Sequence, residues 1–409
     1  MKNIKKNLET YDNAKKIMLK SLEKNKTELV DLKNATDRIL AEDIFSSNNI
    51  PEFSNSAVDG FGFKNSKKKV KNFRIIGESK PGQPFIGKIK KNEAIKVFTG
   101  AYILENINNL DTVSMEEDSI TEGDIVTIKK NYKTGANIRI KGEDVKKNTQ
   151  IFLSGKKIRS VDISQLSSLG KKKVKVYKKL KIGIFSTGDE LCSIDDRKKK
   201  FQIYDSNKLA LCSLFKKIGC EVSDLGIIRD NYIETNKKII EKSKYFDLLV
   251  TSGGISKSET DKIGTFLQKK AKILFWRLSI KPGRPFAFGK IGKTPFIGFP
   301  GNPVATVITF FMLVIHYVKK LSGLNENQII ERILPCDFNL KKKKGRTEWV
   351  RGNIIKRKNK YFLKKFSSTG SGIISSLTQS QGIIELDCKD DYIKKGKMLK
   401  FFRYEDMLN

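Results

Sequence analysis

The sequence is poor in the side chain that most often carries acid-base catalysis at neutral pH. Among its 409 residues there is a single histidine, His316. It lies in the apolar run FFMLVIHYV, a pattern typical of a packed helix, so we expect a core residue and not a metal ligand or base. Histidine-based proton transfer is therefore nearly excluded.

Cysteines are also few, and they are scattered. The five cysteines are an odd number, and no C-x-x-C pair indicates a zinc site or a redox couple, so we expect reduced thiols. Long apolar runs are missing: VITFFMLVI, from Val307, falls short of a membrane span, and no apolar leader follows MKNIKKNLET. These absences predict a cytoplasmic protein with no membrane partner.

Acidic residues are outnumbered, with 45 Asp and Glu against 81 Lys and Arg and a formal net charge of +36. Such a balance by itself favours a polyanionic partner such as nucleic acid. The lysines, however, occur in short groups along the whole chain, at 67–69, 171–173, 198–200 and 341–344. Dispersed groups are typical of solvated faces, so we expect no dedicated nucleic-acid function, with a basic nucleic-acid binder as an alternative.

The length and the changing pattern predict several domains. Residues 1–47 and 146–178 are expected to form an elongated N-terminal domain of helical and mixed structure, opening with a helix that Asp12 could cap. Residues 48–145 form a β-rich insertion domain and 329–409 a small C-terminal β-barrel-like domain. Between them, at 179–328, strands alternate with helices, which predicts a doubly wound, mostly parallel α/β domain with ligands at the carboxyl ends of its strands.

Polar motifs follow the predicted strands of this α/β domain. In STGDEL, the groups of Ser186, Thr187 and Gly188 can meet an oxyanion, and a carboxylate pair that includes Glu190 can face a cation. In SGGIS, Ser252, Gly253 and Gly254 allow a phosphate to approach the backbone. In YDSN, Asp205, Ser206 and Asn207 precede a helix, where they are either caps or ligand contacts.

Two further loops combine glycine, proline and positive charge. WRLSIKPGRPFAFG brings Arg277, Lys281 and Arg284 around a Pro-Gly turn, and GFPGNPVA carries Pro300 and Pro303 before a helix. Proline fixes the backbone and glycine opens it, so both loops suit an anionic group held at a helix start. The alternative is a pair of tight connections.

Outside the α/β domain the signals are weaker one by one. Asp59, in SNSAVDGFGF, holds a metal or ligand or else forms an Asp-Gly turn, and Thr99 follows a strand at a place suited to a phosphate. In the last domain, RTEWVRG and SSTGSGIISS offer Arg351 and Ser371, or a flexible loop. Carboxylates beside anion-binding loops need a bridging cation, most naturally Mg²⁺.

The ordered motifs SAVDGFG, FTGA, RIKGEDV, STGDEL, YDSN, SGGIS, KPGRPFAFG and GFPGNPVA resemble the molybdopterin molybdenumtransferase family, including the corresponding domain of gephyrin. The resemblance implies an elongated four-domain subunit, a homodimer with the active cleft between subunits, and Mg²⁺ dependence. It implies adenylylated molybdopterin and molybdate as substrates, with AMP released, and transient contact with other proteins of molybdenum cofactor biosynthesis. Functional positions carried over by the resemblance are Asp59, Thr99, Glu190, Asp230, Asp261, Lys281, Pro300, Pro303, Arg351 and Ser371.

On this basis a subset of Asp59, Glu190, Asp230 and Asp261 would hold Mg²⁺, while Lys281 and Arg277, with Arg351 and Ser371, would attract molybdate. Three positions depart from the family pattern: Arg277 replaces a usual lysine, Ser258 a common glycine, and 104–106 a proline-containing turn. Adenylylation of molybdopterin from ATP, or a non-catalytic scaffold role, remain the competing hypotheses.

Overall fold

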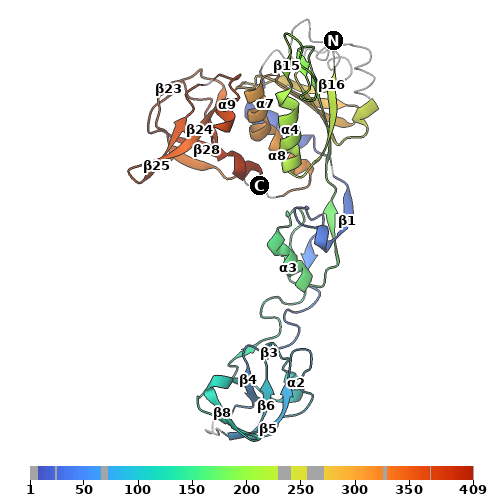
Figure 1. The fold of residues 1–409 in the computed structure, drawn as a ribbon, viewed down its shortest axis with the longest axis vertical. Coiled ribbons are helices and arrows are strands. Elements are labelled where there is room, and N and C mark those ends of the chain that lie inside the picture. The colour runs from blue at the N-terminus through green and yellow to red at the C-terminus, as the bar shows by residue number, and fades with distance from the viewer. Residues whose placement is uncertain are drawn as a thin grey trace.

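The computed structural model describes residues 8–23, 25–65, 72–228, 241–255, 271–325, 329–368 and 370–408. Within these ranges the molecule is elongated (Figure 1). One six-stranded sheet lies at its lower end, two more lie side by side at its upper end, and a narrow stalk joins the two ends. The several sheets and mixed α/β elements agree with the predicted multidomain fold.

The lower sheet, here called the distal sheet, is built from the predicted β-rich stretch. Its strands run in the order β7 (Thr112–Met115), β4 (Gly60–Phe63), β6 (Glu93–Val97), β5 (Asn72–Ser79), β9 (Ile125–Ile128) and β8 (Ser119–Glu122). Strand β4 reads GFGF because its neighbours come very close: a Cβ at Gly60 would lie 1.8 Å from the Ser114 carbonyl oxygen. Short elements around the sheet are β3 (Asn55–Ser56), α2 (Glu105–Asn108), η2 (Glu116–Asp118) and β10 (Ile138–Arg139).

The stalk consists of two antiparallel strand pairs. In each pair, one strand leads toward the distal sheet and the other returns from it. Strand β1 (Thr27–Asp31) pairs with β12 (Lys173–Tyr177), and β2 (Ile44–Phe45) pairs with β11 (Gln150–Phe152). The short η1 (Leu32–Asn34) and helix α3 (Ser160–Ser168) complete it. Its core is small and is formed by Ala35, Leu40, Ile44, Ile158, Leu166, Val174 and Val176.

The α/β sheet runs in the order β16 (Glu221–Ile228), β13 (Lys181–Thr187), β17 (Leu248–Ser252), β21 (Thr294–Phe299), β20 (Pro285–Ile291) and β18 (Lys272–Arg277). The first four strands are parallel, and β20 is antiparallel to both of its neighbours. We did not predict β20, because PFAFGKI is buried over most of its length and so lacks the alternation that marks a strand.

Helices cover one face of this sheet. They are α4 (Ser206–Lys217), α7 (Pro303–Thr309) and α8 (Ile315–Leu321), with a π-helical turn, Phe310–Val314, between the last two. The doubly wound arrangement, with helices on both faces, stays a prediction, because residues 229–240 and 256–270 between its strands lie outside the described residues. Among the described helices, Pro303–Leu321 is long and apolar enough to cross a membrane, but 83% of its apolar window is buried, which is typical of a core helix.

The first helix, α1 (Tyr11–Lys20), packs against the same core. Ala14 and Met18 are buried there, and the Tyr11 hydroxyl donates to the Met312 carbonyl at 2.7 Å. The N-cap is Thr10, whose hydroxyl accepts from the Asn13 amide; the prediction that Asp12 caps this helix is wrong. Asp12 lies in the first turn, where its charge still suits the helix dipole.

The C-terminal sheet runs in the order β19 (Ile280–Lys281), β24 (Thr347–Arg357), β26 (Gly382–Leu386), β28 (Met398–Arg403) and β22 (Arg332–Pro335), with β25 (Lys360–Lys365) on β24. A bridge between Cys336, directly after β22, and Leu363 of β25 brings these two strands together. Strand β19 comes from the Pro-Gly loop of the α/β section, so this loop joins the two upper sheets. Small elements are β23 (Leu340–Lys341), α9 (Ser375–Thr378), β27 (Tyr392–Ile393) and α10 (Tyr404–Leu408).

Candidate functional site

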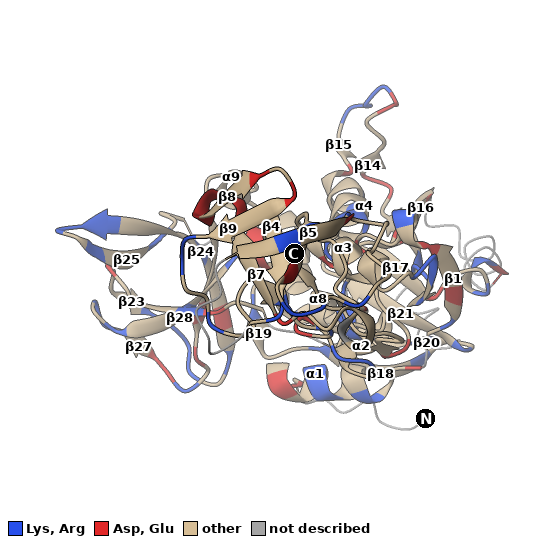
Figure 2. Ribbon diagram, turned by 90° about the horizontal axis from the view of Figure 1, so that it is seen from below, with Lys and Arg blue, Asp and Glu red and all other residues tan. Residues whose placement is uncertain are grey.

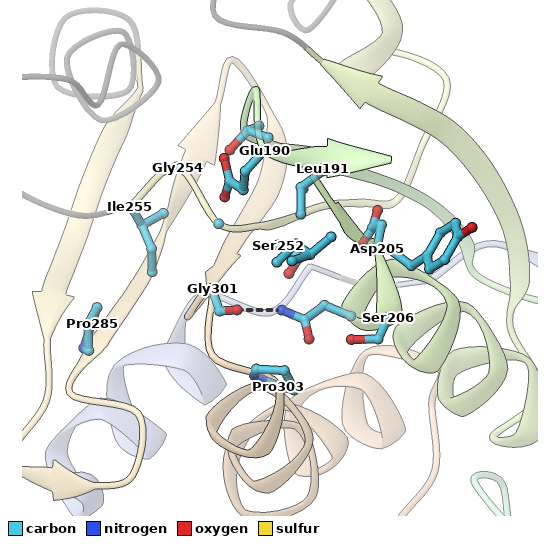
Figure 3. Close-up of a pocket in the computed structure, with 15 residues that line it drawn as sticks. Glu190, Leu191, Asp205, Ser206, Ser252, Gly254, Ile255, Pro285, Gly301 and Pro303 are labelled. Carbon is cyan, nitrogen blue, oxygen red and sulfur yellow. Dashed lines mark hydrogen bonds between the residues drawn. The ribbon is translucent and has the colours of Figure 1, made fainter. Parts of the chain in front are cut away.

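A pocket of about 270 Å³ opens at the carboxyl ends of β13, β17 and β21, the place where open α/β sheets bind ligands (Figure 3). Its lining combines hydroxyls, glycines and two carboxylates with a few apolar groups. The residues are Thr187, Glu190, Leu191, Ile203, Tyr204, Asp205, Ser206, Asn207, Ser252, Gly253, Gly254, Ile255, Pro285, Gly301 and Pro303. Three of the predicted motifs, STGDEL, YDSN and SGGIS, therefore meet in one pocket.

The end of β13 supplies the buried hydroxyls. Ser186 and Thr187 are buried, and among the described residues neither side-chain oxygen has a hydrogen-bond partner. Gly188 follows with φ +143°, and a Cβ there would lie 2.5 Å from the Glu190 carboxylate, so this carboxylate lies close against the loop. Buried hydroxyls without partners are costly, and a ligand that hydrogen-bonds them would remove that cost.

Close approach of two loops explains the paired glycines. Gly253 has φ +82°, and a Cβ on it would lie 2.9 Å from the Thr187 carbonyl oxygen, so only glycine fits between β13 and the β17 loop. Gly254 also has a positive φ, +67°. Ser252, just before them, is buried at the pocket wall.

The YDSN segment serves as both cap and pocket wall. Asp205 caps α4 by accepting from the Lys208 amide at 3.1 Å through Oδ1, while Oδ2 is buried without a hydrogen bond among the described residues. The buried Lys208 ammonium lies 4.0 Å from that Oδ2 and 3.0 Å from Asp224 Oδ1. Asn207 donates to the Gly301 carbonyl at 2.8 Å and ties α4 to the proline loop (Figure 3), whereas Ser206 is exposed.

The proline loop is held by its own helix and by the last domain. The Thr306 hydroxyl donates to the carbonyl of Pro300 at 2.6 Å, and α7 begins at Pro303. The Val304 amide, in the first turn of that helix, donates to the Ser371 carbonyl at 3.3 Å. The serine-glycine loop predicted to carry Ser371 thus touches the helix that forms one wall of the pocket.

Arg351 does not line the pocket. Its side chain is 1% exposed, and it donates to the Ser376 hydroxyl at 2.9 Å and to the carbonyls of Ser368 and Gly370 at 3.2 and 2.9 Å. Burial lowers the pKa of this guanidinium. The role that the geometry gives it is to hold the loop that reaches Val304.

The other basic residues lie beside the pocket and not in its lining. Lys281, in β19, is about half exposed, and its ammonium lies 3.5 Å from Glu348 Oε2. Arg277 ends β18, and its carbonyl accepts from the Glu9 amide. Pro285, four residues after Lys281, does reach the pocket, so the Pro-Gly loop approaches it from this side.

Asp59 and Thr99 lie far from the pocket, on the distal sheet (Figure 1). Asp59 Oδ1 accepts from the Thr99 amide at 2.6 Å and from the Thr99 hydroxyl at 2.8 Å. These two hydrogen bonds, the amide first, keep the pKa of the Asp59 carboxyl below its ordinary value. Within one chain, then, Asp59 and Glu190 do not meet.

The metal prediction is only partly covered by the structure. Asp230 and Asp261 lie outside the described residues. Among the described residues no three histidine, cysteine or carboxylate side chains gather closely enough to hold a metal. The pocket nevertheless offers Glu190, the Oδ2 of Asp205, which accepts no hydrogen bond among the described residues, and the Thr187 hydroxyl. Oxygen donors of this kind suit Mg²⁺, which needs only one or two carboxylates beside water and phosphate.

Two predictions about absent chemistry can be compared with the structure directly. His316 is buried, and burial, then Lys15 and Lys319, lowers its pKa to about 3, so it is neutral at physiological pH. It packs in the core helix, as predicted. All five cysteines are free thiols, and no two of them form a disulfide.

Sequence analysis did not single out three apolar residues of the pocket, Leu191, Ile203 and Tyr204. They belong to β14 (Leu191–Cys192) and β15 (Ile203–Tyr204), a short parallel pair directly beside the STGDEL and YDSN motifs. Their position was the available signal, because Leu191 ends the STGDEL motif and Tyr204 begins YDSN.

Comparison with known proteins matches the chain almost end to end. Residues 9–170 match the MoeA N-terminal region (domain I and II), 183–320 a probable molybdopterin binding domain, and 334–402 the MoeA C-terminal region (domain IV). A molybdopterin molybdenumtransferase of Haemophilus influenzae is 35% identical over 98% of this chain and 99% of its own. Gephyrin of Dictyostelium discoideum is 29% identical over 96% of this chain and 62% of its own.

A solved structure agrees in fold. The molybdopterin biosynthesis moeA protein from Pyrococcus horikoshii OT3 is 27% identical, with a TM-score of 0.82 over 97% of this chain and 100% of that one. Agreement at this level extends to the elongated arrangement of the domains. The chain therefore belongs to the MoeA family of molybdopterin molybdenumtransferases, to which gephyrin is related.

Proposed function

We propose that this protein inserts molybdate into adenylylated molybdopterin in the cytosol and releases AMP. The observation that carries the proposal is the pocket at the carboxyl ends of β13 and β17, where the hydroxyl of Thr187 and one oxygen of Asp205 are buried without hydrogen-bond partners among the described residues. Such atoms suit a ligand rich in hydrogen-bonding groups, such as a pterin phosphate.

The pocket residues bind and orient the adenylylated pterin in this proposal. Gly253 and Gly254 let a phosphate approach the backbone, and the N-termini of α4 and α7 direct amide groups toward the same region. Lys281 and Arg277, in and beside the Pro-Gly loop, attract molybdate to the dithiolene sulfurs. As the two sulfurs bind molybdenum, they give up their protons and molybdate oxygen leaves as water. Water adds across the phosphoanhydride bond, so that AMP is released and molybdopterin keeps its own phosphate.

Mg²⁺ bound through Glu190 and Asp205, with Asp59, Asp230 and Asp261 as further candidates, would offset the negative charge of the phosphates. Without such an ion, two carboxylates in the pocket would repel an anionic substrate. The carboxylates orient the ion and the substrate. A substrate that hydrogen-bonds to the buried Thr187 hydroxyl leaves no room for water beside it.

We further propose that the working unit is a homodimer. Asp59 is exposed and is held by two hydrogen bonds from Thr99. It lies on the distal sheet, at the opposite end of the elongated subunit from the pocket (Figure 1). A second copy of the elongated subunit can bring its own Asp59 to this pocket, which makes one site from two chains.

Molybdate-dependent release of AMP tests the function. Purified protein is incubated with preformed adenylylated molybdopterin, MgCl₂ and molybdate, and AMP is measured by chromatography; we expect turnover that requires all of them. A parallel reaction with molybdopterin and ATP tests the adenylylation hypothesis. Formation of the adenylylated pterin from ATP, with no response to molybdate, would refute the proposal, and so would tight binding of substrate without turnover.

A further inference from the structure

The loop between β14 and β15, residues 193–202, extends away from the body of the molecule (Figure 2). We call this loop the basic arm. Four consecutive residues, Arg197, Lys198, Lys199 and Lys200, are all exposed on it. Two acidic residues, Asp195 and Asp196, offset part of this charge, and the arm keeps a net positive balance.

An exposed aromatic residue follows the four cations. Phe201 is 88% exposed and has φ +67°, a left-handed conformation that is strained for a bulky side chain. The other non-glycine residues with positive φ in the described chain are Asn, Asp and one Lys. An exposed phenylalanine in this conformation gains no packing energy that would explain it, so a role outside the folded core is indicated.

Cations lie against the aromatic rings of the arm. The Lys200 ammonium is 5.2 Å from the centroid of Phe201, and the Lys198 ammonium is 5.7 Å from that of Tyr204, which is 48% exposed. Rings flanked by cations suit a ligand that carries both a flat base and a phosphate.

The arm lies at the pocket mouth. Ile203 and Tyr204 line the pocket, and Phe201 is three residues before Tyr204, so its backbone lies within about 10 Å. The pocket, at about 270 Å³, is smaller than the ~300–1,000 Å³ clefts that bury most of a drug-sized ligand. A substrate made of a pterin and a nucleotide must therefore extend beyond it, and the arm borders that exit.

We propose that the basic arm binds the nucleotide half of the substrate, with its cations on the phosphate and the Phe201 ring stacked on the purine base. This inference rests on the proposed function, because it takes a purine nucleotide monophosphate as the ligand. Pterin and dithiolene lie in the pocket, and the adenylate lies against the arm.

Replacement of the aromatic ring gives the first test, with AMP as the probe. Phe201→Gly removes the ring and relieves the left-handed strain, so the melting temperature should stay equal or rise. The dissociation constant for AMP, measured by titration calorimetry, should rise about 5- to 100-fold, and Phe201→Tyr should restore most of the affinity. Wild-type affinity in Phe201→Gly would overturn the inference.

Replacement of the cations gives the second test. Lys198, Lys199 and Lys200 are changed together to Gln, and a matched control changes Lys171, Lys172 and Lys173, a surface group on the stalk. The arm variant should weaken AMP binding and flatten its salt dependence, and the control should not. Equal effects in both variants would mean that general charge, and not the arm, attracts AMP, which would overturn the inference.

Two outcomes separate this inference from its alternatives. If the arm variant keeps its AMP affinity but loses dimer mass in sedimentation, the arm belongs to a contact with a second copy and the inference is wrong. If wild type binds AMP through the arm but shows no molybdate-dependent release of AMP from adenylylated pterin, the proposed function fails while the arm's ligand class stands.

Discussion

The α/β pocket and the Asp59 turn of the distal sheet both carry predicted functional residues, but they differ in how those residues are satisfied. In the pocket, the hydroxyl of Thr187 and one carboxylate oxygen of Asp205 are buried and lack hydrogen-bond partners among the described residues. On the distal sheet, Asp59 is exposed and already accepts two hydrogen bonds from Thr99. The pocket has buried polar atoms without hydrogen bonds, whereas the Asp59 carboxylate already has hydrogen-bond donors within its own chain.

This difference indicates complementary roles. A buried polar group without a partner costs about 1–3 kcal/mol, a cost that a bound ligand can remove. An exposed carboxylate that accepts two hydrogen bonds carries little free-energy cost in the free protein, because solvent still hydrates it. The same hydrogen bonds orient it before any ligand binds. The pocket is therefore built to enclose a substrate, and Asp59 to be presented to one from another surface.

The largest effect should come from removing one carboxylate from each region. Glu190→Gln and Asp59→Asn should each lower molybdate-dependent AMP release by about 100-fold or more, because both neutralise charge that faces the phosphates or their cation. Asp124→Asn is the control, since Asp124 is an exposed carboxylate on the same distal sheet, paired with Arg74. If Asp59→Asn behaves like this control, the two regions do not share a site.

The pocket should show a trade between stability and activity. Thr187→Val replaces a buried hydroxyl without a partner by a methyl group of similar size, so the free energy of unfolding should rise by about 1 kcal/mol. The Michaelis constant for adenylylated molybdopterin should rise at the same time. Urea unfolding and initial rates measure the two effects, and a loss of stability would show that the hydroxyl is satisfied in the free protein.

A smaller effect is expected at the contact between the last domain and the pocket. Ser376→Ala removes the hydroxyl that accepts from Arg351 Nε, which loosens the loop leading to Ser371 and Val304. We expect the apparent Michaelis constant for molybdate to rise about 3- to 10-fold with kcat little changed. The neighbouring exposed residue provides the control, Ser375→Ala. An unchanged Michaelis constant in Ser376→Ala would show that the hydrogen bond to Arg351 does not position the loop for molybdate.

The smallest functional effect should come from His316, which does not line the pocket and is not on the distal sheet. Its folded pKa, about 3, is below its unfolded value, so the unfolded chain binds the extra proton and stability falls as pH drops from about 6.5 toward 3. Because the chain has one histidine, its imidazole NMR resonances are unambiguous. They should stay at the neutral position down to pH 5 while activity is unaffected by His316→Gln. A titration near pH 6.5 would contradict the burial.

The pocket could be predicted because parallel strands present their carboxyl ends at one edge. STGDEL, YDSN and SGGIS follow strands or precede helices of one sheet, so local patterns sufficed to expect them together. For Asp205, predicted as a cap or a ligand contact, the cap is confirmed, because one oxygen accepts from the Lys208 amide. The ligand contact stays a prediction, and the second oxygen is buried without a hydrogen bond among the described residues.

Other features depend on long-range placement that no local pattern contains. The separation of Asp59 from Glu190 follows from the stalk, which holds the distal sheet away from the α/β sheet. The sequences of its two short strand pairs do not predict the direction in which the stalk extends. The buried position of Arg351 follows from the loop at 368–376, which folds over it, and an arginine before glycine in the sequence looks the same whether exposed or enclosed.

Mixed dimers provide the most direct test of the central claim, that the pocket of one chain works with Asp59 of another. Inactive Asp59→Asn and Glu190→Gln proteins are unfolded, mixed in equal amounts and refolded together, and AMP release is measured. Half of the resulting dimers would be mixed, each with one intact site of two, so about a quarter of wild-type activity should return. If the mixture stays as inactive as its components while sedimentation confirms mixed dimers, the two regions do not form a site across chains.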